Sequence, residues 1–168
     1  PQLSDKIKIP IFIVQHMPPK FTASLAERLN VMSPLEVKEA VNDEVVRNGV
    51  VYIAPGGFHM TLKKDMTGRI LIQTSEMPEN VLHRPSVDVM LDSVQQIYGK
   101  NTLGVIMTGM GKDGLESIKK LKTLGGYCLA QDEQSCVVYG MPRAIVDNGL
   151  ADVIASLEDI PKILNQAI

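Results

Sequence analysis

The sequence predicts an α/β fold, a doubly wound and mainly parallel sheet with flanking helices and a small β-hairpin. Short apolar runs rich in β-branched residues alternate with longer stretches whose apolar residues recur at helical spacing. No long linker, internal repeat or low-complexity stretch interrupts the 168 residues. Because a chain of this length buries roughly 70% of its unfolded surface, we expect one domain over residues 1–168.

The predicted strands are short and are bounded by glycine, proline or polar residues. The first is an apolar run with Pro10 near its start, typical of a buried parallel strand. The second ends at Pro55-Gly56-Gly57, and the third and fourth are joined through residues 65–68 as a hairpin. The predicted strands cover residues 7–14, 50–54, 60–63, 69–74, 103–107 and 127–130.

The predicted helices occupy the stretches between these strands. Pro18 and Pro19 precede the first helix, as is common before a first helical turn. Gly125 and Gly126 follow the third helix, and glycine is the usual residue after a helix end. The predicted helices cover residues 21–31, 87–98, 115–124, 142–148 and 160–167.

Composition is that of an ordinary globular domain, with 45% hydrophobic and 21% charged residues. A net charge of −2 does not favour a nucleic-acid or anionic-membrane partner. No apolar run approaches the roughly 20 residues of a membrane span, and no signal peptide is recognised. Cys128 and Cys136 match no disulfide or metal pattern, so we expect a cytoplasmic protein without membrane insertion.

Two polar residues follow predicted strands at what should be one edge of the sheet. His16 comes directly after the first strand, and Asp113 lies in the loop after residues 103–107. In such sheets the chemistry collects beyond the carboxyl ends of the strands. Histidine is the usual general base near neutral pH, and an ionised aspartate at the first turn of the next helix is able to orient an imidazolium. Taken singly, His16 fits a structural histidine equally well, and Asp113 fits a helix N-cap.

The loop after the strand at 127–130 is long for its place, and long loops at this edge often bind ligands. It carries Ser135 and Cys136, the only hydroxyl and thiol here in reach of His16. For Ser135 we favour a cap or turn role. For Cys136, which precedes two valines, we favour a small buried side chain.

The glycine-rich run at residues 109–114 offers an alternative function. Gly109-Met-Gly-Lys-Asp-Gly114 matches the G-x-G-x-x-G pattern, and Asp132 follows at about the distance of a ribose-binding acid. Against this, Asp113 would present a carboxylate to the pyrophosphate at the helix N-terminus. Lys112 would offset that repulsion only if its side chain turned inward. Dinucleotide binding through 109–114 therefore stays the alternative.

Read together, these loops resemble the catalytic domain of the chemotaxis protein-glutamate methylesterases. The resemblance covers most of the chain in order. The segments that carry it are QHMPPKFTASLAERLN at 15–30, VYIAPGGFHM at 51–60, HRPSVDVMLDSV at 83–94, GVIMTGMGKDG at 104–114 and AQDEQSCVVYGMP at 130–142.

The resemblance implies hydrolysis of glutamate γ-methyl esters, and deamidation of glutamines, on the cytoplasmic helices of methyl-accepting chemoreceptors. It implies a Ser-His-Asp triad in which His16 is the general base and Asp113 orients it, and it places one oxyanion donor at the backbone N–H of Met110. No metal or organic cofactor is expected. An upstream receiver domain, usual in the family, is a further expected partner that this chain does not contain.

One family feature is missing from the chain. The family's nucleophile lies in a serine–threonine–glycine–glycine turn about two dozen residues before the histidine, and only 15 residues precede His16 here. Ser4 lies before the strand that His16 follows, which at about 3.3 Å per residue separates them by some 25 Å. We therefore expect a chain that starts at Pro1, lacks the first strand and helix with the nucleophile serine, and is inactive alone. A non-catalytic receptor-binding module is the other interpretation.

The remaining candidates are weaker. His59 and His83 show no ligand spacing with His16, so no metal site is expected. Arg84 is able to meet an acidic receptor surface, although an arginine is more often solvated. Methionine makes adaptable surfaces for helical partners, although core packing explains most methionines equally well. Methionines are numerous around the expected cleft, namely Met17, Met60, Met107, Met110 and Met141.

Overall fold

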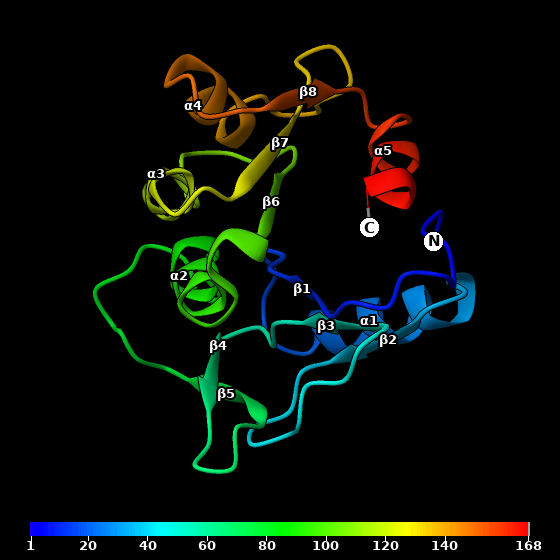
Figure 1. Cartoon of the computed structure of the whole chain (residues 1–168), viewed down its shortest axis with the longest axis vertical. Coiled ribbons are helices and arrows are strands. Elements are labelled where there is room, and N and C mark those ends of the chain that lie inside the picture. The colour runs from blue at the N-terminus through cyan, green and yellow to red at the C-terminus, as the bar shows by residue number, and fades with distance from the viewer. Residues whose placement is uncertain (168) are drawn as a thin grey trace.

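A computed structural model describes residues 1–167 and shows an α/β fold of mainly parallel strands (Figure 1). In chain order the elements are β1 (Ile11–Ile13), α1 (Phe21–Met32), β2 (Glu36–Glu39), β3 (Val50–Ile53), β4 (His59–Lys64), β5 (Ile70–Ser75), α2 (Val87–Tyr98), the 3-10 turn η1 (Gly99–Asn101), β6 (Leu103–Ile106), α3 (Leu115–Thr123), β7 (Tyr127–Gln131), α4 (Met141–Asp147), β8 (Val153–Ala155) and α5 (Ile160–Ala167). The α/β class predicted from the alternation of the segments is confirmed.

The strands form two parallel groups and one hairpin. The first group has the order β1-β3-β2 and the second the order β6-β7-β8, and all four of these pairings are parallel. Strands β4 and β5 form the predicted antiparallel hairpin, with His59 opposite Ser75. Parallel pairing places the carboxyl ends of the strands in each group at one edge.

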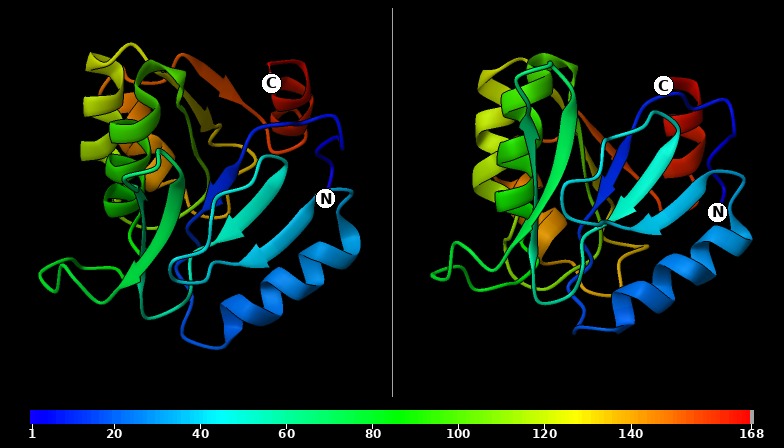
Figure 2. Two further views of the ribbon diagram at one scale, coloured as in Figure 1. Left: turned by 60° about the horizontal axis from the view of Figure 1, so that its bottom comes forward. Right: turned by 90° about the horizontal axis from the view of Figure 1, so that it is seen from below.

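Helices cover both faces of each parallel group (Figure 2). Helix α1 packs on one face of β1-β3-β2 through Ala26, Val37 and Ile53, while the hairpin and α2 cover the other face around Tyr52. Helices α3 and α4 cover one face of β6-β7-β8, and α5 covers the other. Helix α2 belongs to both halves, because Met90 and Val94 pack with the first group while Leu91 packs with the second.

Three details differ from the predicted elements. Strand β1 is shorter than residues 7–14 because it begins after Pro10, which lacks the N–H that pairing requires, and its residues are half-buried rather than buried. Strand β2, Glu-Val-Lys-Glu, was not predicted because only Val37 of it is buried. The three-residue strand β8 is too short for a periodic signal. None of the helices in the described part of the chain is long and apolar enough to cross a membrane.

Candidate functional site

The structure brings His16 and Asp113 together at the carboxyl edge of the strands. His16 lies in the loop after β1, and Asp113 lies in the loop between β6 and α3. Nε2 of His16 is 2.8 Å from Oδ2 of Asp113, although 97 residues separate the two in sequence. The side chain of Asp113 is 6% exposed and that of His16 is 25% exposed. The carboxylate is therefore shielded from water, while the imidazole is open to it.

Asp113 is held by the N-terminus of α2, and not by the helix that follows it in sequence. Oδ2 accepts a hydrogen bond from the backbone N–H of Val87 at 2.7 Å, and Oδ1 accepts one from the N–H of Asp88 at 3.1 Å. The hydroxyl of Ser86, the N-cap of α2, donates to Oδ1 at 2.8 Å. Asp113 does lie next to the first turn of α3, as the sequence predicts, but its carboxylate binds the N-terminus of α2 instead. The principle of an anion at a helix N-terminus still applies.

At this end, α2 and α3 are joined by two carboxylates, each of which accepts a backbone N–H of the other helix. Asp113, just before α3, caps α2, while Oδ1 of Asp88 in the first turn of α2 accepts the N–H of Ser117 in α3 at 2.7 Å. Gly114 allows the close approach, since it has φ of +97° and a Cβ there would lie 2.9 Å from Val87. The position of Asp113 is therefore fixed by two helices at once.

The electrostatics of Asp113 follow from these contacts. Burial opposes ionisation of the carboxyl group, but hydrogen bonds from His16, Val87, Asp88 and Ser86 outweigh burial and lower its pKa to about 2, from an ordinary 3.8. Asp113 is consequently ionised throughout the neutral range. It accepts a hydrogen bond from the N–H of His16, and the proton stays on the imidazole. The Nε2 of His16 is then the donor, which leaves Nδ1 as the basic nitrogen of the neutral ring.

This pKa predicts an acid-sensitive contribution to stability. Because the folded-state pKa of Asp113 lies below its unfolded-state value, the ionised group stabilises the fold above about pH 4 and loses that effect as the pH falls toward 2. The contribution is about 2 kcal/mol at neutral pH. Urea unfolding of wild type and Asp113→Asn at pH 7 and at pH 2.5 measures it. We expect the difference in the free energy of unfolding between the two proteins to be smaller at pH 2.5 than at pH 7. A difference that does not change with pH would contradict the lowered pKa of Asp113.

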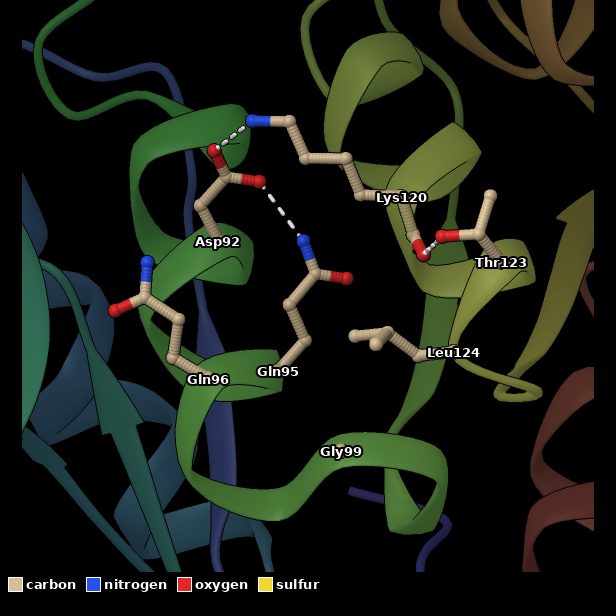
Figure 3. A pocket seen from close by; sticks show the side chains of 7 residues that line it. All are labelled: Asp92, Gln95, Gln96, Gly99, Lys120, Thr123 and Leu124. Carbon is tan, nitrogen blue, oxygen red and sulfur yellow. Dashed lines mark hydrogen bonds and ion pairs between the residues drawn. The ribbon is translucent and has the colours of Figure 1, made fainter.

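A depression on the surface contains the candidate base. It measures about 260 Å³ and is lined by His16, Met17, Pro18, Leu82, His83 and Arg84. Another depression, of about 420 Å³, lies between α2 and α3 toward the carboxyl end of α2, away from Asp113 (Figure 3). There Gln95 donates to Asp92, which also pairs with Lys120. The ion pair of Asp92 with Lys120 joins α2 to α3, while the contact with Gln95 lies within α2.

Ser135 and Cys136 lie in the long loop as predicted, and their contacts are structural. The hydroxyl of Ser135 donates to Oδ1 of Asp132 at 2.6 Å and accepts from the N–H of Leu157 at 2.9 Å. Cys136 is half-buried rather than buried, and burial raises the pKa of its thiol. Burial likewise raises the pKa of Cys128 to about 12. Neither thiol is therefore a ready nucleophile at neutral pH.

The glycine-rich run is arranged for packing around Asp113. The N–H of Ser117 at the start of α3 is already taken by a carboxylate, and Asp132 is engaged by Ser135. The N–H of Leu115 in the same turn donates to the carbonyl of Lys112, so two N–H groups at the start of α3 are engaged within the chain. The side chain of Met110 is 77% exposed, on a loop anchored where the N–H of Gly109 donates to the carbonyl of Val138.

The remaining predicted residues divide between core and surface. His59 is buried, its Nε2 lies 3.2 Å from the carbonyl of Pro78, and burial lowers its pKa. Ser4 lies before β1, and its N–H donates to Asn165 of α5. Among residues 1–167, no cluster of three or more histidine, cysteine or acidic side chains is placed to hold a metal. Of the five methionines expected around the cleft, Met60 and Met141 are buried, Met17 is half-buried, and Met107 and Met110 are exposed.

Sequence reasoning missed two contributors to the site. Ser86 is recognisable in the sequence as a helix N-cap, but nothing local shows that its hydroxyl binds Asp113. His83 stacks on the ring of His16 with centroids 4.3 Å apart. A histidine held by a shielded aspartate beyond the carboxyl ends of parallel strands is an arrangement in which the imidazole is able to act as a base toward a nucleophile.

Comparison with known proteins identifies the family of the chain. The family model of the CheB methylesterases matches residues 1–164, and the chain belongs to this family. A protein-glutamate methylesterase/protein-glutamine glutaminase of Desulfitobacterium hafniense is 49% identical over 161 residues, which cover 96% of this chain and 41% of that protein. A protein of the same name from Lawsonia intracellularis is 45% identical over 99% of this chain and 46% of its own length. The chain thus spans less than half the length of these relatives.

A solved structure shares the fold. The crystal structure of the Thermotoga maritima CheB methylesterase catalytic domain superimposes with a TM-score of 0.94 at 43% sequence identity. The match covers 99% of this chain and 87% of the Thermotoga chain. The crystallised domain therefore contains residues beyond those that correspond to this chain.

Proposed function

We propose that this domain hydrolyses glutamate γ-methyl esters, and deamidates glutamines, on the cytoplasmic helices of chemoreceptors. The observation that carries the proposal is the 2.8 Å contact between His16 and Asp113 at the carboxyl edge of a CheB methylesterase fold. The names of the relatives support both reactions. In this reading, Asp113 orients the imidazole, and His16 is the general base.

The reaction is an acyl transfer in two halves. A nucleophilic hydroxyl loses its proton to Nδ1 of His16 as its oxygen attacks the γ-carbonyl carbon of the ester. The tetrahedral oxyanion accepts the N–H of Met110, and the intermediate collapses as methanol leaves with the proton from His16. Water, deprotonated by the same nitrogen, then attacks the acyl carbon, and the bond to the nucleophile's oxygen breaks as that oxygen takes the proton back from His16, which releases the glutamate carboxylate. With a glutamine substrate, ammonia leaves in place of methanol.

We further propose that the nucleophile is a serine on a strand outside residues 1–168. Ser135 is engaged by Asp132, and Ser4 lies at the other end of β1 from His16. Among the described residues, β1 pairs with β3 alone and β6 with β7 alone, and β1 is the strand of its group nearest to β6-β7-β8 (Figures 1 and 2). The half-buried apolar residues of β1 suit a further parallel neighbour there. The greater extent of the Thermotoga domain supports the same view.

The test compares this 168-residue chain with the full-length protein. Methanol release from methylated chemoreceptors should be measurable for the full-length protein and undetectable for the chain alone, because no activated hydroxyl accompanies His16. Esterase activity of the chain alone would contradict the external serine. Receptor association without hydrolysis by either protein would favour the non-catalytic binding module.

A further inference from the structure

The ring of His16 is held on two sides by different kinds of contact. Asp113 binds its edge through Nε2, and His83 covers one of its faces with the two ring planes inclined by 18°. A single hydrogen bond still allows the imidazole to rotate about the line joining the two bonded atoms. A stacked ring removes that freedom, because rotation would separate the faces. The two contacts together therefore define both the position and the plane of the base.

The segment that carries His83 is anchored to the same site. Residues 76–86 form neither helix nor strand, yet several hydrogen bonds tie them down. The carbonyl of Arg84 accepts the N–H of Gly57 at 3.3 Å, and the next two residues, Pro85 and Ser86, are buried. The hydroxyl of Ser86 donates to Asp113. This segment thus supplies two contacts to the site. The hydroxyl of Ser86 binds Asp113, and the ring of His83, three residues earlier, stacks on His16.

We propose that His83 is a positioning residue for His16, an inference that rests on the proposed function. Its ring keeps the His16 imidazole in the plane that directs Nε2 at Asp113 and Nδ1 at the reacting hydroxyl. His83 itself exchanges no proton with the substrate in this role, so a non-titrating aromatic ring should replace it.

Kinetics of the full-length protein test this role. Removing the stacked ring in His83→Ala should lower kcat about tenfold and change KM by less than about threefold, since the plane of the base matters only as the proton moves. His83→Phe keeps the face and should stay within about threefold of wild type in kcat. Glu79→Ala, an exposed change in the same segment, is the matched control and should behave as wild type. Loss in the Phe variant equal to that in the Ala variant would overturn the stacking role.

A spectroscopic readout separates positioning from catalysis. In the same proteins labelled with ¹⁵N-histidine, the Nε2-bound proton of His16 should give a downfield resonance in wild type and in His83→Phe. The resonance should broaden or vanish in His83→Ala, because the hydrogen bond to Asp113 then fluctuates. An unchanged resonance and an unchanged kcat in His83→Ala would overturn the proposal. If wild type hydrolyses no ester, the proposed function fails, and the resonance still decides whether His83 positions His16.

Discussion

Replacing His16 by alanine is expected to abolish ester hydrolysis by the full-length protein, with kcat reduced about 10⁴-fold or more. The reason is that Nδ1 of this ring is the base that activates the hydroxyl and then returns the proton to methanol. Because the His16 side chain is 25% exposed, its removal leaves only a small buried cavity and should not unfold the domain. Methanol release from methylated receptors is the measurement, with circular dichroism to confirm folding.

His16→Gln is the companion variant for His16→Ala. Its side-chain amide keeps a donor for the carboxylate of Asp113, so the aspartate is not left without its partner. It should be as inactive as the alanine variant but closer to wild type in stability. Activity within tenfold of wild type in either variant would exclude His16 as the general base.

Replacing Asp113 by asparagine should lower kcat by about 10⁴, the loss that the corresponding change causes in serine proteases with this triad. An amide must place its NH₂ group where one carboxylate oxygen now accepts two hydrogen bonds. If it replaces Oδ2, it faces both the N–H of Val87 and Nε2 of His16. His16 would then accept at Nε2 and carry its proton on Nδ1, the nitrogen that should act as base. In that orientation the base carries the wrong tautomer.

Asp132→Asn is the matched control for Asp113→Asn. Asp132 also follows a strand at the carboxyl edge, but its carboxylate binds the N–H and the hydroxyl of Ser135. Both hydrogen bonds end on Oδ1, so the carbonyl oxygen of asparagine keeps them, and the change removes only the charge. It should cost less than about 1 kcal/mol of stability and leave kcat at the wild-type value. Equal losses of activity in the two variants would contradict the assignment of Asp113 and would point to a general effect of charge at this edge.

Much of this architecture could be predicted because the signals are local. Hydrophobic periodicity located α2 over residues 87–98 to the residue, and the strand at 103–107 within one residue. The position of His16 and Asp113 after parallel strands predicted that they would share an edge. Strands β2 and β8 were missed because short, mostly exposed strands have little periodic pattern of burial.

By itself, the sequence determined the α/β class, most elements, the family resemblance and the two residues of the candidate pair. Tertiary structure alone decided how that pair is held. Asp113 binds the N-terminus of α2 rather than that of α3, His83 stacks on His16, and the hydroxyl of Ser135 is committed to Asp132. The first two contacts join residues 26 and 67 positions apart, which no local pattern encodes. They arise because α2 packs against both parallel groups and carries its N-terminus to the place where their loops meet.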